Sequence, residues 1–226
     1  GSAGFGIEPV YLVIAFSTIA TTLGVNWYEK IFRDSFLFSK KIALKDSREV
    51  LVRSFTRDDF GQLRKFLNGL VEEGAYIAID RPLSSSEERE MDEDSLVRMN
   101  RREMILWVVE SGGKIIGRVS AERMQRRERD NVSLSFYISK EFRGAGLGTV
   151  LIRLIIRESI KLFKPHNLYL TVYSDNEKAI ALYKREGFEK LGVLPDWMKN
   201  NDTYMDRVYM VYKPGQKGAS EKRGKK

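Results

Sequence analysis

The stretch FYISKEFRGAGLGT, residues 136–149, joins an apolar strand-like run to an amphipathic helical pattern. Gly144, Gly146 and Gly148 stand at the entrance of the predicted helix, where they let the backbone approach a ligand closely. The unpaired amides of a first helical turn and the positive end of the helix dipole favour an anion. The stretch therefore predicts a pyrophosphate cradle, although glycine-rich turns of this kind also occur for structural reasons alone.

Two better-known phosphate loops are excluded by the same residues. Thr149 stands where the dinucleotide fingerprint G-x-G-x-x-G requires its third glycine. The stretch also lacks the Gly-Lys-Ser/Thr of a P-loop. The function has to be sought with a second motif, NEKAIALYKREGF, which occupies residues 176–188 after the next strand-like run.

Together the two motifs resemble the GCN5-related N-acetyltransferase superfamily. Its cofactor loop runs Arg/Gln-x-x-Gly-x-Gly/Ala, and its later helix runs Asn-x-x-Ala-x-x-x-Tyr-x-x-x-Gly-Phe. The likeness extends from about Leu44 to Lys213 and leaves residues 1–43 outside. The positions that match the two patterns are Arg143, Gly146, Gly148, Asn176, Ala179, Tyr183, Gly187 and Phe188.

The resemblance implies an enzyme that uses acetyl-CoA to acetylate a primary amine on a small molecule or a protein. The loop amides would hold the CoA pyrophosphate, the strand end at 137–139 would bind the pantetheine arm, and Asn176 would steady the cofactor. The cofactor residues implied in this way are Tyr137, Ile138, Ser139, Arg143, Gly144, Ala145, Gly146, Leu147, Gly148, Thr149 and Asn176.

The resemblance also makes Tyr183 the catalytic residue, as donor to the departing sulfur. A phenol has a pKa near 10 and a thiol near 8.5, so full proton transfer to the thiolate is uphill by roughly 2 kcal/mol. Tyr183 is therefore expected to act as a hydrogen-bond donor first and a proton donor second. The alternative is a packing aromatic four residues after Ala179.

The proton of the attacking amine has no obvious acceptor. Many members of the family carry a glutamate on the strand before the cofactor loop, but here that strand reads VSLSF at residues 132–136. Glu73, Glu122 and a chain of waters are the substitutes that remain. This departure keeps open a second class of function, a regulatory module that binds acyl-CoA without turnover.

Acidic side chains gather where the family borders its acceptor cleft. They would steer a cationic amine, or they form a solvated helix face with a capping box from Ser85 to Glu88. The residues concerned are Glu87, Glu88, Glu90, Asp92, Glu93 and Asp94.

The pattern of apolar residues predicts the order β-α-α-β-β-β-α-β-α-β-β from residue 50 onward. Three antiparallel strands precede a βαβ-like crossover, which indicates an α/β (α+β) fold with a mixed, mostly antiparallel sheet and helices on both faces. The predicted division of the chain is an apolar helix and connector at 1–48, an acetyltransferase domain at 49–213 and a disordered basic tail at 214–226.

The uncharged run at residues 9–28 predicts a helix that either anchors the protein in a membrane or packs on protein, including a second copy of the chain. If it inserts, the basic residues that follow would keep the main domain cytoplasmic. The chain has no cysteine and a single histidine, His166, so we expect no metal. Much of the formal charge of +8 lies in the tail, and we expect no nucleic-acid partner.

Overall fold

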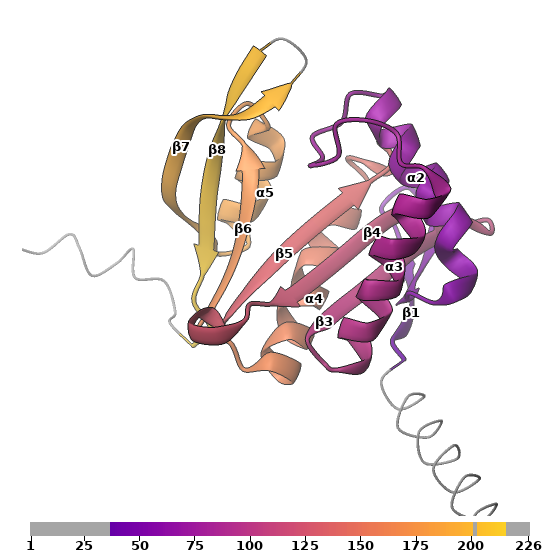
Figure 1. The fold of residues 1–226 in the computed structure, drawn as a ribbon, viewed down its shortest axis with the longest axis horizontal. Coiled ribbons are helices and arrows are strands. Elements are labelled where there is room, and N and C mark those ends of the chain that lie inside the picture. The colour runs from indigo at the N-terminus through magenta and orange to yellow at the C-terminus, as the bar shows by residue number, and fades with distance from the viewer. Residues whose placement is uncertain (1–36, 201–202, 216–226) are drawn as a thin grey trace, which may run out of the picture. The chain divides into compact units, whose positions relative to one another are not determined.

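The computed structural model describes residues 37–200 and 203–215. These residues form an eight-stranded sheet in the order β1-β2-β3-β4-β5-β6-β8-β7 (Figure 1). All neighbouring strands are antiparallel except β5 and β6, which are parallel. The predicted mixed, mostly antiparallel sheet with helices on both faces is confirmed. The apolar helix at 9–28 and tail residues 216–226 lie outside the described residues.

The strands of the sheet are β1 (Ser39–Ala43), β2 (Glu49–Ser54), β3 (Met104–Ser111), β4 (Lys114–Arg123), β5 (Asn131–Ile138), β6 (Asn167–Tyr173), β7 (Glu189–Asn200) and β8 (Thr203–Tyr212). The α-helices are α2 (Phe60–Glu72), α3 (Ser85–Asn100), α4 (Leu147–Phe163) and α5 (Glu177–Arg185). Short 3-10 turns are η1 (Arg57–Asp59), η2 (Arg126–Glu128) and η3 (Lys140–Phe142).

The central strand β3 divides the core into two layers, because successive side chains of a strand point to opposite faces. Leu106 and Val108 pack with α2 and α3 in front of the sheet. Trp107 and Val109 pack in the cluster that contains α4 behind it (Figure 1). All four side chains are at most 2% exposed. A strand covered on both faces reads as a continuous apolar run, which explains the sequence of β3.

The sheet begins earlier than the sequence indicates. Strand β1 lies in the segment predicted to be a connector, and it pairs with β2 from Ser39 opposite Arg53 to Ala43 opposite Glu49. Only Ile42 of its five residues is buried, so the strand has almost no apolar signal of its own. The division at residues 48 and 213 stays a prediction.

The last two strands are longer than the sequence predicts, since the strand-like runs there cover only residues 189–193 and 207–212. β7 continues past Val193 to Asn200 and pairs with β8, with register shifts that include Leu194 to Met198. Pro195 lies within this irregular part of an edge strand, where a missing N–H breaks no ladder on the outer side. Because a proline followed by aspartate reads as a strand breaker in sequence, the extension was missed.

None of the helices in the described part of the chain combines the length and the apolar composition needed to cross a bilayer. The longest of them, α4 with 17 residues, has its apolar side packed in the core behind the sheet.

Candidate functional site

The parallel strands β5 and β6 separate part-way along their length (Figure 1). They pair only at three positions, the last being Ser133 opposite Tyr169. Beyond Ser133, none of the described strands pairs with the edge of β5 that faces β6, so backbone N–H groups on that edge can bind a ligand.

Ser139 identifies which amides of β5 face this gap. Its backbone N–H and its hydroxyl both donate to the Ile116 carbonyl, at 2.9 and 3.1 Å, and so point toward β4. Successive residues of a strand direct their N–H and C=O groups to opposite edges. The amides of Ile138 and Phe136 therefore face the gap, whereas the predicted contact of Ser139 with a pantetheine arm would have to compete with β4.

The glycine loop follows directly at the open end of the gap. Gly144 and Gly146 have φ angles of +81° and +87°, which favour glycine strongly. A Cβ on Gly144 would meet nothing within 4 Å, so its surroundings are open. The first intrahelical bond of α4 runs from the Val150 N–H to the Gly146 carbonyl, and the amides of 147–149 have no intrahelical acceptor. These features fit the predicted phosphate cradle.

Gly148 has a packing role that the sequence did not reveal. A Cβ at this position would lie 3.2 Å from a Leu182 methyl carbon and 3.8 Å from one of Ile138. The missing side chain lets the start of α4 approach α5 and the end of β5. The close approach brings the loop, the unpaired strand edge and the second sequence motif into one place.

Arg143 braces the loop with its side chain. Its Nε donates to the Ile138 carbonyl at 2.8 Å, and its guanidinium forms an ion pair with Glu73 at the end of α2. The guanidinium is thus engaged by the protein itself, and the Arg143 backbone N–H donates to the Lys140 carbonyl at 3.2 Å, so the predicted contact of Arg143 with the cofactor would have to compete with both.

Tyr183 lies against the open part of β5. Its ring centroid is 6.1 Å from that of Phe136 and 6.0 Å from that of Phe188. Burial, with a smaller contribution from Tyr137, raises the pKa of the Tyr183 hydroxyl above its usual value. The structure shows no hydrogen bond from this hydroxyl to another described residue. A neutral hydroxyl of this kind can donate to a ligand, and it is a poorer acid than an exposed tyrosine.

Asn176 caps α5 with its side-chain oxygen, which accepts from the Ala179 N–H at 3.2 Å. This contact is a sufficient structural reason for an asparagine here. Its side-chain NH₂ group stays available for the predicted cofactor contact.

Sequence reasoning missed the turn between β1 and β2. The Lys45 N–H donates to the Ala145 carbonyl at 3.3 Å, and the Arg48 guanidinium carbon lies 4.2 Å from the centroid of the Phe142 ring. The turn therefore lies against the glycine loop. The residues that meet are about 100 positions apart in sequence, so no local signal could have revealed them.

The loop between α2 and α3 reaches the far side of the gap. The Tyr173 hydroxyl of β6 donates to the Ile77 carbonyl at 3.1 Å, and the Tyr76 hydroxyl donates to the Asp175 carboxylate at 2.6 Å. These contacts connect the two parted halves of the sheet at the end where the strands have separated.

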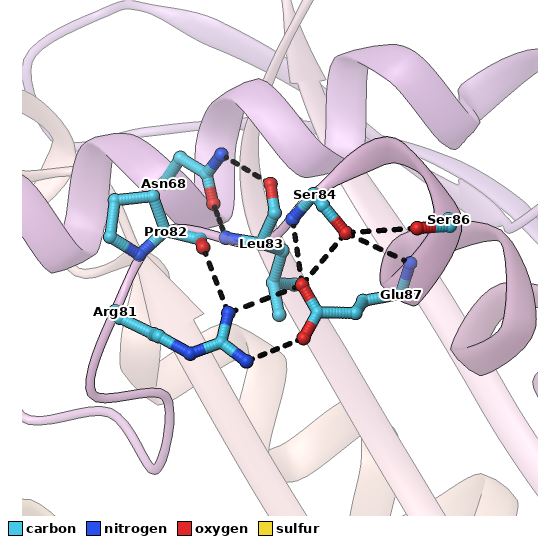
Figure 2. A network of polar contacts seen from close by, with 7 residues as sticks. All are labelled: Asn68, Arg81, Pro82, Leu83, Ser84, Ser86 and Glu87. Atoms are coloured by element: carbon cyan, nitrogen blue, oxygen red, sulfur yellow. Dashed lines mark hydrogen bonds and ion pairs between the residues drawn. The ribbon is translucent and has the colours of Figure 1, made fainter.

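Figure 2 shows how the same loop is tied down before α3. The Asn68 side chain makes two hydrogen bonds to the backbone of Leu83, and Ser84 and Glu87 form the capping box of α3. The predicted box, Ser85 with Glu88, was wrong by one residue. A hydrogen bond from the Arg81 guanidinium is the main cause that lowers the pKa of the Glu87 carboxyl to about 2, and hydrogen bonds from Ser84 are the next.

The acidic side chains of α3 do not form one continuous acidic surface. Glu88 and Asp92 are buried under the helix, where Glu88 pairs with Arg64. Glu87 and Glu93 are engaged by arginines of their own. Burial raises the pKa of the Asp92 carboxyl to about 7, with the Glu88 charge as the second cause.

The two carboxylates considered as bases are both paired. Glu73 forms an ion pair with Arg143, and Glu122 forms an ion pair with Arg98 at 3.0 Å. No side chain of residues 132–136 supplies a carboxylate either. Within residues 37–200 and 203–215, no three potential ligands gather in a way that could hold a metal ion.

A comparison with known proteins decides the family. The profile of the acetyltransferase (GNAT) family matches residues 73–188, which include the glycine loop and the motif of α5. The chain belongs to the acetyltransferase (GNAT) family. The predicted family is thereby confirmed, and the matched segment contains β3 to β6 together with both helices of the site.

A relative that matches part of this chain is also an N-acetyltransferase. The L-amino acid N-acetyltransferase AaaT of Escherichia coli is 28% identical over 100 residues, which are 44% of this chain and 62% of AaaT. The chain thus matches less than two thirds of that protein.

Two solved acetyltransferase structures share the fold. An acetyltransferase of the family from Streptococcus pneumoniae has a TM-score of 0.65 at 25% identity and covers 73% of this chain and 99% of its own. Spermidine N-acetyltransferase from Vibrio cholerae, solved with CoA and spermine, has a TM-score of 0.62 at 24% identity. It covers 73% of this chain and 95% of its own.

Proposed function

We propose that this chain is an acetyl-CoA-dependent N-acetyltransferase that transfers the acetyl group to a primary amine by direct attack on the thioester. The observation that carries the proposal is the parting of β5 from β6 after Ser133, directly beside the glycine loop and the Tyr183 ring. An unpaired strand edge next to unpaired helix amides suits a ligand with an amide-bearing arm and a diphosphate.

In this proposal each residue has one task. The amides of 147–149 bind the diphosphate, and the Ile138 N–H binds the pantetheine arm in place of Ser139. The Tyr183 hydroxyl donates to the thioester sulfur as the bond to the acetyl carbon breaks. Its raised pKa keeps the hydroxyl protonated at neutral pH, which supports a role as hydrogen-bond donor before proton donor.

The acceptor amine has to lose a proton without a dedicated carboxylate. An alkylammonium with a pKa near 10.4 is neutral in about one molecule per few thousand at pH 7, which corresponds to roughly 4 to 5 kcal/mol. The nearby Glu73 is paired with Arg143. We therefore propose that water carries the proton away and that the rate rises with pH toward the pKa of the amine. Small amines are the first acceptors to test, because the names of two similar proteins refer to L-amino acids and to spermidine.

The experiment follows release of the CoA thiol from acetyl-CoA with amino acids, polyamines and peptide N-termini, beside a titration of CoA binding. We expect CoA to bind and at least one amine to raise thiol release well above hydrolysis. CoA binding without any amine-dependent thiol release would favour the second candidate, an acyl-CoA-binding regulatory module. The absence of a carboxylate from residues 132–136 supports that candidate. Absence of CoA binding would exclude both.

A further inference from the structure

The turn between β1 and β2 is attached to the glycine loop at two points. The Lys45 N–H bonds to Ala145 inside the loop, and Arg48 stacks on Phe142 just before it. The turn is therefore a neighbour of the loop with a defined position, although it lies outside the matched segment that begins at residue 73.

The side chain of Lys45 runs along Gly146. Three of its carbons, Cγ, Cδ and Cε, lie 3.3 to 3.4 Å from the point that a Cβ on Gly146 would occupy. The ammonium is one bond beyond Cε. The absent side chain of Gly146 thus leaves room for the lysine stem, and the stem brings a cation to the edge of the loop.

The charges around the loop favour an anion beside that cation. A diphosphate carries negative charge that the helix end offsets by only about half an elementary charge. Arg143 is already engaged by Glu73. The carboxylate next to Lys45, Asp46, is held by Arg48 at 2.6 Å. Among the ion pairs of the described residues, Lys45 has none, so its charge is not offset by the protein.

We propose that the Lys45 ammonium binds the diphosphate of CoA, so that the β1–β2 turn forms one wall of the cofactor site. The inference rests on the proposed function, since it needs CoA at the loop. It adds a cofactor residue about 100 positions before the glycine motif, on a hairpin that the family match does not include.

The test compares Lys45→Met with Lys45→Arg and with Lys41→Met by titration of CoA and of 3′-dephospho-CoA. Methionine keeps the unbranched stem and removes only the charge. Lys41, exposed on β1 of the same hairpin, is the matched control. We expect Lys45→Met to weaken CoA binding about fivefold at low salt, with a smaller loss at high salt because exposed charges are screened. Arginine should retain most of the affinity, and Lys41→Met should leave it unchanged.

The two ligands distinguish which phosphate is bound. A diphosphate contact predicts the same fold loss for CoA and for 3′-dephospho-CoA. A loss confined to CoA would overturn the assignment in favour of the 3′-phosphate. Unchanged binding by a folded Lys45→Met variant would overturn the proposal while leaving the proposed function intact. Failure of the wild-type protein to bind CoA would instead remove both.

Discussion

The glycine loop and the face of the sheet under α3 differ in how their residues are gathered. In the loop, residues 143–149 are consecutive, and the three amides of 147–149 lie together at the start of α4 without intrahelical acceptors. Under α3, the polar side chains come from separate elements, for example Glu88 from α3 with Arg64 from α2. A site made from consecutive backbone groups is readable in sequence, whereas a set of buried charges depends on packing. Three variants test this difference.

The largest effect is expected from Tyr183→Phe. This variant tests whether the Tyr183 hydroxyl, which lies near the glycine loop, takes part in catalysis. Loss of the hydroxyl should lower kcat about a hundredfold, as is common for lost proton donors, and leave the Kd for acetyl-CoA nearly unchanged. Steady-state kinetics and a binding titration give the two values.

Tyr212→Phe is the control for that variant, because its ring lies 5.5 Å from Phe188 in the same aromatic cluster. It should leave kcat near the wild-type value. If kcat of Tyr183→Phe stays within about twofold of wild type, Tyr183 packs and does not donate.

A second variant, Gly146→Asp, tests the loop itself. The substitution puts a Cβ against the Lys45 stem at φ +87° and a carboxylate beside the proposed diphosphate. CoA affinity should fall by more than tenfold, which is more than about 1.4 kcal/mol. Titration of the folded variant measures the loss.

Backbone strain alone has to be separated from the charge effect. Gly113→Asp is the matched control, since Gly113 has a φ of +74° in the β3–β4 turn and open space around it. It should lower stability by a similar strain and leave CoA binding intact. Equal affinity losses in both variants would contradict a diphosphate at Gly146.

The smallest effect concerns the other region, where Asp92→Asn should act on stability and not on the cofactor. Burial raises the pKa of Asp92 from 3.8 to about 7 in the folded state. The folded protein therefore prefers the protonated form. The stability that the protonated Asp92 carboxyl contributes is fully present below about pH 4, and it is lost as the pH rises through 7.

Asp92→Asn should consequently stabilise the protein by about 1 kcal/mol at pH 8, with a smaller gain at pH 5. Urea unfolding at the two pH values measures this difference. Asp94→Asn, an exposed position on the same helix, should change little at either pH. A loss of CoA affinity in Asp92→Asn would show that the two regions are coupled.

Much of the fold was determined by sequence alone, because periodic apolar residues report locally on strands and helices. The crossover from β5 through α4 to β6 and the antiparallel β3, β4 and β5 were predicted correctly. The glycine loop and the Tyr183 motif also identified the family, since each is a contiguous pattern.

Only the tertiary structure decided which groups these elements bring together. It directs Ser139 toward β4 and the Ile138 amide toward the gap, and it places Gly148 against Leu182. It also makes a strand of the polar segment Ser39–Ala43, whose pairing with β2 depends on a partner and not on its own residues. The Lys45 stem reaches Gly146 only because the β1–β2 turn docks on the loop. Contacts between residues 100 positions apart are fixed by packing, and the sequence carries no local trace of them.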